Sequence, residues 1–247
     1  MKRAILAAIC CAIAGMLSGA TTPGDDKRDL EGIWEVLYAP ANLEAHSAEA
    51  GIRAGDTVIV DPPDGKIPYK PEARAKQLEN FKNRATADPV SKCYLPGVPR
   101  ITYMPFPFEI FQTPKDFAIT YEYVHASRTI HMAKQEHLPD IDFWMGDSRG
   151  HWDGNTLVVD VADNNKMTWL DASGNYHSEK LHVVERYTKT SPETMTYEAT
   201  IDDPVVYTRP WTIRLQLWRH TAKNAELYEY ECHVYKEEAA GKAAGPK

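Results

Sequence analysis

The stretch "KLHVVERYTKTSPETMTYEATID", residues 180–202, decides the fold class of this chain. β-Branched and aromatic residues alternate with polar ones on both sides of the turn-forming "TSPE" (190–193). A period of two is typical of strands with one buried face, so the stretch predicts a hairpin. Further hairpins are predicted around three other turns: "PKD" between "FEIFQT" and "FAITYEYVH", "DGN" within "HWDGNTLVVDVAD", and "TAKNA" between "WTIRLQLWRH" and "ELYEYECHVYK".

Many short strands joined by local turns favour a mainly β fold, an antiparallel meander that closes into a lipocalin-like barrel. One segment has helical periodicity instead. We expect a helix near residues 70–85, with a proline in its first turn and Ala75, Leu78 and Phe81 on its buried face. After it, five prolines between residues 88 and 108 predict a long Pro-rich loop that wraps the domain or lines a pocket.

The first 20 residues of the chain predict export. Residues 1–20 combine a basic start, an apolar stretch too short to span a bilayer, and the small residues that signal peptidase requires, so we expect a signal peptide. The expected divisions after it are a flexible leader at 21–29, a single β-barrel domain at 30–236 and a disordered tail at 237–247. No other apolar run has the length of a membrane helix. We therefore expect a periplasmic or secreted protein without membrane insertion.

Charge and cysteine content narrow the function classes. The full chain has a net charge of −7, and loss of Lys2 and Arg3 with the signal peptide makes it −9. Nucleic-acid recognition needs a basic face, so we expect no nucleic-acid partner. The mature chain keeps Cys93 and Cys232 in an oxidising compartment, and the sequence leaves open whether they form a disulfide or remain free thiols.

The loop "WLDASGNYH" (169–177) is the first candidate site. The sequence contains no nucleophile elbow, P-loop, dinucleotide-binding glycine motif or H-E-x-x-H motif, so we expect no cofactor and no metal. In this loop His177 is a candidate general base, Asp171 its orienting partner and Trp169 a wall of the site, because imidazole exchanges protons near neutral pH. The alternative is that Asp171 only caps a turn.

The strand that follows supplies two more candidates, His182 as a base and Glu185 as a carboxylate. Strand alternation places these two side chains on opposite faces, so at most one of them points inward. The alternative is an outward His182 and a Glu185 paired by a cation from another strand. His177, His182 and Glu185 have the right atoms for a metal, but their spacing fits neither a helical nor a strand ligand pattern.

Aromatic residues elsewhere suit a ligand cavity. In "YEYVHASR" (121–128), Tyr121, Tyr123 and His125 are expected on one strand face, with Tyr121 as a proton donor; the alternative is an interior packed with tyrosines. Three more side chains are expected to bind substrate: Trp211 and Tyr103 by stacking on its ring, and Arg209 by reaching it unless it pairs with a neighbouring aspartate.

The connection "HLPDIDFWMGDSRGHWDG" (137–154) has two interpretations. One is a solvated, turn-rich loop in which Arg149 pairs with a carboxylate. The other is a rim over an aromatic pocket, with His151 as its imidazole. We favour the first for the aspartates.

The chain resembles a large, mostly uncharacterised family of exported bacterial proteins over roughly residues 88–215. The motifs that carry the resemblance are "HWDGNTLVVD", "TWLDASGNYHSEKLHVVER" and "DDPVVYTRPW". The chain departs from the family pattern at Asp147, where a histidine is expected, and at "ADNNKMTW" (162–169), where Gly-Phe is expected before Asn. The resemblance implies a lipocalin-like barrel that handles small apolar or aromatic molecules outside the cytoplasm. In role, it is also similar to bacterial lyases that release formaldehyde from lignin-derived phenylpropanoid dimers.

These observations predict an exported, cofactor-independent lyase or isomerase that acts on a small aromatic or phenolic compound by acid–base chemistry. The alternative is a non-catalytic periplasmic carrier of hydrophobic small molecules. A structural envelope protein is a third interpretation, which a solidly packed interior would favour. The expected partner is a small hydrophobic or aromatic ligand, and a homo-oligomer stays open.

Overall fold

The computed structural model describes residues 26–44, 57–133, 135–138 and 140–241 of the chain. The predicted signal peptide, most of the predicted leader and the last residues of the predicted tail lie outside these ranges. Within them, no helix combines the length and the apolar character needed to cross a membrane.

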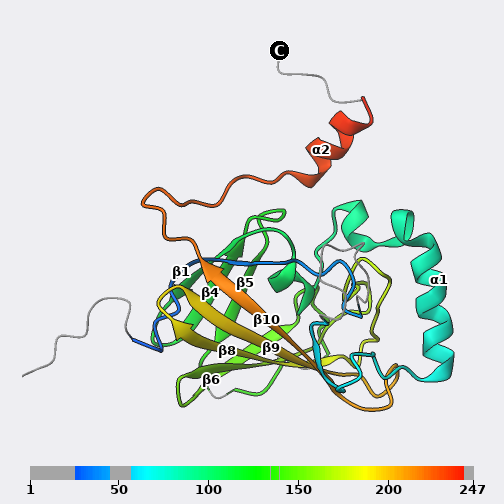
Figure 1. The fold of residues 1–247 in the computed structure, drawn as a ribbon, viewed down its shortest axis with the longest axis horizontal. Coiled ribbons are helices and arrows are strands. Elements are labelled where there is room, and N and C mark those ends of the chain that lie inside the picture. Colours follow the sequence, from blue (N-terminus) through cyan, green and yellow to red (C-terminus); the bar gives the residue numbers. More distant parts are fainter. Residues whose placement is uncertain (1–25, 45–56, 134, 139, 242–247) are drawn as a thin grey trace, which may run out of the picture.

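The described residues form a mainly β protein built on a closed barrel (Figure 1). Strand β1 pairs with both β3 and β10, which closes the sheet and removes its edges. A short strand, β2 (Ile59–Asp61), pairs with the first residues of β10 beyond the end of β1. The nine barrel strands among the described residues are β1 (Gly32–Val36), β3 (Phe108–Gln112), β4 (Asp116–Tyr121), β5 (Ser127–His131), β6 (Asp147–Asp153), β7 (Thr156–Ala162), β8 (His182–Ser191), β9 (Thr194–Asp202) and β10 (Trp211–Arg219).

The hairpins form where alternation and turn residues predict them. β8 and β9 pair antiparallel along their length, and buried and partly exposed residues alternate in both strands. The β6–β7 hairpin turns at Gly154 and Asn155, since Asp153 pairs with Thr156. Gly154 has a φ of +59°, a left-handed conformation that glycine adopts at little cost. The predicted mainly β barrel is therefore confirmed.

One strand pair departs from the predicted antiparallel meander. β5 and β6 are parallel, with Ile130 opposite Ser148. Parallel neighbours cannot be joined by a hairpin, so a longer connection between His131 and Asp147 links the two strands. β6 also begins at Asp147 rather than near His151, because the polar "DSR" continues the pairing with β7.

One end of the barrel, here called the capped end, carries the helices and long loops (right side of Figure 1). The predicted helix is α1 (Pro71–Ala87), and the Pro-rich loop contains two short 3-10 helices, η2 (Pro89–Lys92) and η3 (Arg100–Tyr103). The prediction of which face of α1 is buried is wrong. The helix docks on the loop of residues 163–181 through polar side chains, which buries Ala73 and Gln77 and leaves Leu78 and Phe81 exposed.

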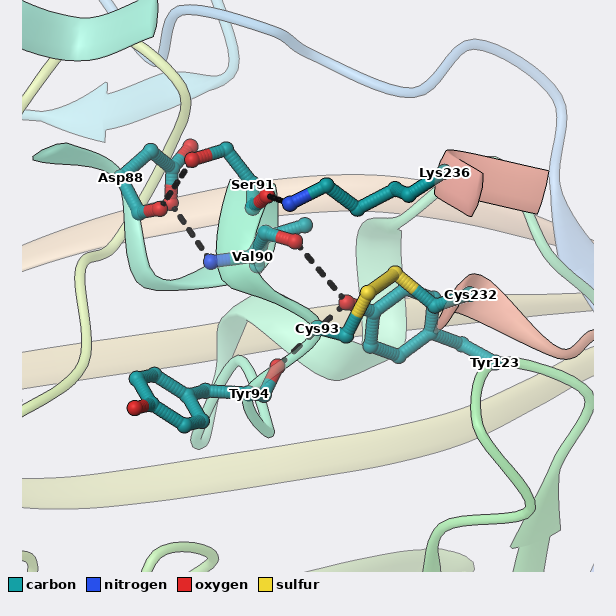
Figure 2. Close-up of a disulfide and its surroundings, with 8 residues drawn as sticks. All are labelled: Asp88, Val90, Ser91, Cys93, Tyr94, Tyr123, Cys232 and Lys236. Carbon is teal, nitrogen blue, oxygen red and sulfur yellow. Dashed lines mark hydrogen bonds between the residues drawn. A yellow bond between two sulfur atoms is a disulfide. The ribbon is translucent and has the colours of Figure 1, made fainter. Parts of the chain in front are cut away.

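The C-terminal segment does not form the predicted fourth hairpin. After β10, residues 220–231 contain only an isolated bridge between Tyr123 and Tyr230, and the chain then forms helix α2 (Cys232–Ala239) outside the barrel. The helix extends into the start of the segment expected to be disordered. Cys232 is bonded to Cys93, so the disulfide that the sequence left open is present (Figure 2).

Large side chains fill the barrel interior. The fully buried residues there include two indoles and several phenol and phenyl rings, contributed by strands all around the barrel. Those with the largest side chains are Trp34, Phe108, Phe117, Tyr121, Tyr187, Tyr197 and Trp211.

Candidate functional site

Glu185 points into the barrel, where a buried ionic network surrounds its carboxylate. Arg128 of β5 pairs with it from across the interior, and both side chains are at most 1% exposed. The hydroxyls of Tyr187 and Tyr197 donate to Glu185 Oε1 over 3.0 and 2.8 Å. Burial opposes the charge of Arg128, but Glu185, Tyr121 and Tyr187 together outweigh it and raise the pKa of Arg128 well above its usual value. The carboxylate is therefore held by a cation from another strand.

Tyr121 lies beside this network without joining it. Its hydroxyl is buried and has no hydrogen-bond partner within the described residues, and burial raises its pKa to about 12. The phenol therefore stays protonated at neutral pH. Trp211 is also fully buried in the interior, and its indole nitrogen likewise lacks a partner among the described residues.

The loop that precedes β8 does not contain the predicted His–Asp pair. Asp171 is buried and accepts hydrogen bonds from the backbone of Leu43 and Ser173 and from the side chain of Asn175, which fixes the loop. Burial raises the pKa of its carboxyl group. His177 instead contacts the hydroxyl of Thr168, with 2.7 Å between Nε2 and Oγ1, and the backbone carbonyl of Ser178. These contacts agree with the alternative interpretation, in which Asp171 only caps a turn.

His177 is held as a neutral imidazole. A carbonyl oxygen can only accept, so Nδ1 donates to Ser178 and Nε2 accepts from Thr168. Burial lowers the pKa of His177, which agrees with this assignment. The side chain borders a cavity of about 530 Å³ between α1 and the loop of residues 163–181, next to Lys76 and Tyr176. Trp169 lies nearby, paired through its backbone with Tyr176.

His182 lies on the outer face of β8, opposite to Glu185. Its Nε2 is 2.9 Å from Asp160 Oδ1 on β7, and this hydrogen bond raises the pKa of His182. Asp160 Oδ1 also lies 2.8 Å from Nε2 of His137, whose Nδ1 is 3.0 Å from Asp147 Oδ2. Together with Asp163, these residues form a group that we call the outer cluster: His137, Asp147, Asp160, Asp163 and His182.

The outer cluster was not predicted from the sequence. His182 was a candidate, but its partners come from three separate segments, and 137–154 was interpreted as a solvated connection around an Arg149–carboxylate pair. That pair is present, since Arg149 Nε donates to Asp147 Oδ2 over 2.9 Å. His177, His182 and Glu185, whose spacing argues against a shared metal ion, do not converge in the structure, because His182 and Glu185 face opposite sides of β8.

The predicted substrate-binding residues are divided among several places. Tyr103 and Tyr123 border a cavity of about 380 Å³ at the capped end, here called the cap cavity. His125 is exposed and pairs with Glu231, because β4 ends at Tyr121 and the chain turns away; the prediction of one shared strand face is wrong. Arg209 does pair with an aspartate, but with Asp61 of β2 rather than with its own neighbours.

The cap cavity has aromatic walls from distant parts of the chain. Phe106, Tyr123 and Tyr230 form a cluster with ring centroids 4.5 to 5.6 Å apart. Tyr123 and Cys232 of the disulfide line the same cavity, and the Tyr123 hydroxyl donates to the carbonyls of Val90 and Tyr94, next to Cys93 (Figure 2). Other residues that line the cavity are Ala39, Pro40, Ala41, Arg100, Met104, Pro105, Ala172 and Cys232.

Two comparisons with known proteins were made, and neither finds a match. No family model matches the chain. No curated protein matches it either. The functional argument therefore depends on the site geometry.

Proposed function

We propose that this protein binds small uncharged aromatic molecules in the cap cavity, as an extracytoplasmic carrier does. The observation that supports the proposal is the cavity itself, about 380 Å³ in volume and walled by the rings of Phe106, Tyr123 and Tyr230. Sites for small molecules commonly have a few hundred Å³ of mostly apolar, aromatic lining. Aromatic rings also favour offset or edge contacts with a bound ring.

The polar groups of the cavity wall argue for an uncharged ligand. Tyr103 donates to the carbonyl of Leu170 over 2.7 Å. Arg100 makes a bidentate ion pair with Asp88, with both N–O distances at 2.8 Å, and both side chains are nearly buried. A charged ligand would have to break this pair to find a counter-charge, and breaking a buried pair is costly. An uncharged ring leaves it intact.

A lyase that releases formaldehyde stays a prediction. Acid–base catalysis needs an acid and a base within reach of one substrate. The predicted set does not converge on one cavity: His177 lies beside α1, His182 on the outer face, and Glu185 and Tyr121 in the filled interior. A carrier does not require an acid and a base to meet in one cavity. Release of formaldehyde from a panel of lignin dimers would favour the enzyme instead.

The proposal is tested with N-phenyl-1-naphthylamine, an uncharged aromatic probe whose fluorescence rises in apolar surroundings. We expect saturable binding in the micromolar range. Ala41→Trp places an indole in the cavity mouth and should weaken binding about tenfold or more, which corresponds to about 1.4 kcal/mol. The matched control is Ala222→Trp, at an exposed site away from the cavity, which should bind the probe as the wild type does.

Two results would contradict the proposal. One is a wild-type protein that shows no saturable rise in fluorescence. The other is equal affinity for Ala41→Trp and Ala222→Trp, which would place the probe elsewhere.

A further inference from the structure

We propose that His137, Asp147 and Asp163 of the outer cluster bind a divalent transition-metal ion. One ring nitrogen of His137 and one carboxylate oxygen of each aspartate lie within 4.8 Å of one another. Ligands about 2.1 Å from a tetrahedral zinc ion are roughly 3.4 Å apart, so small side-chain rotations bring the three atoms to bonding distance. The inference is independent of the cap cavity.

The barrel strands place the two carboxylates side by side. Asp147 begins β6 and pairs with Ala162, the last residue of β7, and Asp163 follows immediately. Both aspartates therefore lie at the same end of neighbouring strands. His137 comes from the connection between β5 and β6. The three ligands thus belong to three segments, which the sheet and its crossover bring together.

Asp163 carries an oxygen whose contacts are incomplete. Its Oδ2 is shielded from solvent and has no hydrogen-bond partner within the described residues. Burial of an unpartnered carboxylate oxygen is unfavourable. A bound cation would satisfy this oxygen. Within the described part of the chain, Asp163 Oδ2 therefore lacks the positively charged partner that a metal ion would provide.

Asp160 orients the imidazole for this role. It accepts from Nε2 of His137 over 2.8 Å and from Nε2 of His182 over 2.9 Å. A carboxylate that accepts from one ring nitrogen fixes the ring and directs the other nitrogen to the metal, as in many zinc sites. The other ring nitrogen of His137, Nδ1, is directed toward Asp147 and lies 3.0 Å from its Oδ2.

Charge also favours a cation. Asp147, Asp160 and Asp163 bring three carboxyl groups together, and Arg149 forms an ion pair with Asp147 alone among them. The hydrogen bonds from Arg149, His137 and the Leu138 backbone all go to Oδ2 of Asp147. Its Oδ1 makes no hydrogen bond within the described part of the chain. Asp147 can therefore keep its bond to Arg149 and still offer an oxygen to the ion.

The donor set indicates the class of metal. One imidazole with two carboxylates suits Zn²⁺ or Mn²⁺ better than a soft ion, which prefers thiolate or thioether ligands. Three protein ligands leave at least one position for water or a ligand. The side chains of His137 and Asp160 are 28% and 41% exposed, so an ion can enter from solvent.

The test is isothermal titration of the chelator-treated full-length mature protein with ZnCl₂, and separately with MnCl₂, at pH 7.5. We expect one high-affinity equivalent of Zn²⁺ per chain. Asp163→Asn and His137→Gln should each weaken Zn²⁺ binding at least tenfold. The matched controls are His220→Gln and Glu35→Gln, a surface pair 3.2 Å apart in which Glu35 lies on β1 and His220 directly follows β10, and which should leave the affinity unchanged.

A second measurement keeps the test decisive if a variant does not fold. In histidine ¹H–¹³C spectra of the wild type, added Zn²⁺ should shift the ring signals of His137 and His182 and leave those of His220 in place. Unchanged signals from His137, Zn²⁺ affinity that is equal in Asp163→Asn and wild type, or equal loss of affinity in His220→Gln would each overturn the assignment.

Discussion

Glu185 is at the centre of the barrel, where an ionised carboxylate is tolerated only if charge and hydrogen bonds surround it. Arg128 supplies the charge, and Tyr187 and Tyr197 supply hydroxyl donors. A carboxylate whose oxygens are engaged by these partners, in an interior packed with large side chains, is poorly placed to reach a substrate. At the residue scale, Glu185 is therefore better explained as the group that fixes how three strands pack inside the barrel than as a catalyst.

His177 allows a prediction about pH. Burial lowers its pKa below that of an unfolded histidine, although Ser178 and Asp203 act in the opposite direction. Below about pH 6.5 the unfolded chain therefore binds a proton that the folded chain does not. The free energy of unfolding should fall as the pH drops through this range, by at most about 1.4 kcal/mol per pH unit from this group. Above it, the contribution is constant.

His177→Asn is the variant that isolates this effect, because its amide can still donate to Ser178 but does not titrate. Urea unfolding should show the variant less stable at pH 7.5, by about 1 kcal/mol for the lost bond to Thr168. The difference should shrink at pH 5.0, since only the wild type then loses stability at this site. A difference that stays constant with pH would rule out a buried neutral His177.

At the element scale, local patterns predict hairpins well and long connections poorly. Alternation and turn residues suffice for β8–β9 and for the Gly154 turn, because those contacts join neighbours in sequence. The parallel β5–β6 pair depends on a crossover that no short motif signals. The segment 226–236 alternates like a strand but has no free barrel edge to join, since β1 closes the barrel against β10.

The docking of α1 on the 163–181 loop gives a prediction at this scale. Gly174 has a φ of +80°, and a Cβ there would lie 2.7 Å from Asn80 Cβ and 2.8 Å from the backbone nitrogen of Phe81. Gly174→Ala should therefore cost about 1–2 kcal/mol in backbone strain and a further 1–3 kcal/mol or so in overpacking. Gln77 and Asn80, which donate to this loop, would be displaced.

Gly154→Ala is the matched control for Gly174→Ala. Its φ of +59° carries similar strain, but an added Cβ would meet nothing within 4 Å. Urea unfolding should therefore show a clearly larger loss of stability for Gly174→Ala. Equal losses in the two variants would mean that the loop does not pack on α1 as described.

For the whole molecule, barrel closure decides which residues meet. Arg128 and Glu185 are 57 positions apart, and Arg209 and Asp61 are 148 apart. The sequence indicates that each needs a partner of opposite charge, but only the register of the closed sheet selects it. The outer cluster was missed for the same reason, as its ligands come from three segments. The sequence therefore predicts which residue types can carry charge or exchange protons, but it does not predict which of them come together in the folded chain.

The Cys93–Cys232 disulfide leads to a prediction about the whole molecule. It joins residues 139 positions apart and holds α2 against the capped end, where Lys236 also donates to the Ser91 carbonyl (Figure 2). His125 pairs with Glu231 just before the helix. Cross-linking a loop of this length restricts the unfolded chain. Cys93→Ser/Cys232→Ser should therefore lower the free energy of unfolding by about 2–5 kcal/mol.

The same variant separates the stability of the barrel from the integrity of the cap cavity. The barrel closes through β1 and β10 without the disulfide, so far-UV circular dichroism should keep its β-sheet signal below the unfolding transition. Tyr230 and Cys232 line the cavity and are held only by weak contacts once the bond is gone, so affinity for N-phenyl-1-naphthylamine should fall several-fold. Unchanged affinity and unfolding midpoint in the double variant would show that α2 stays docked without its covalent link, and that the surface contacts alone complete the cavity wall.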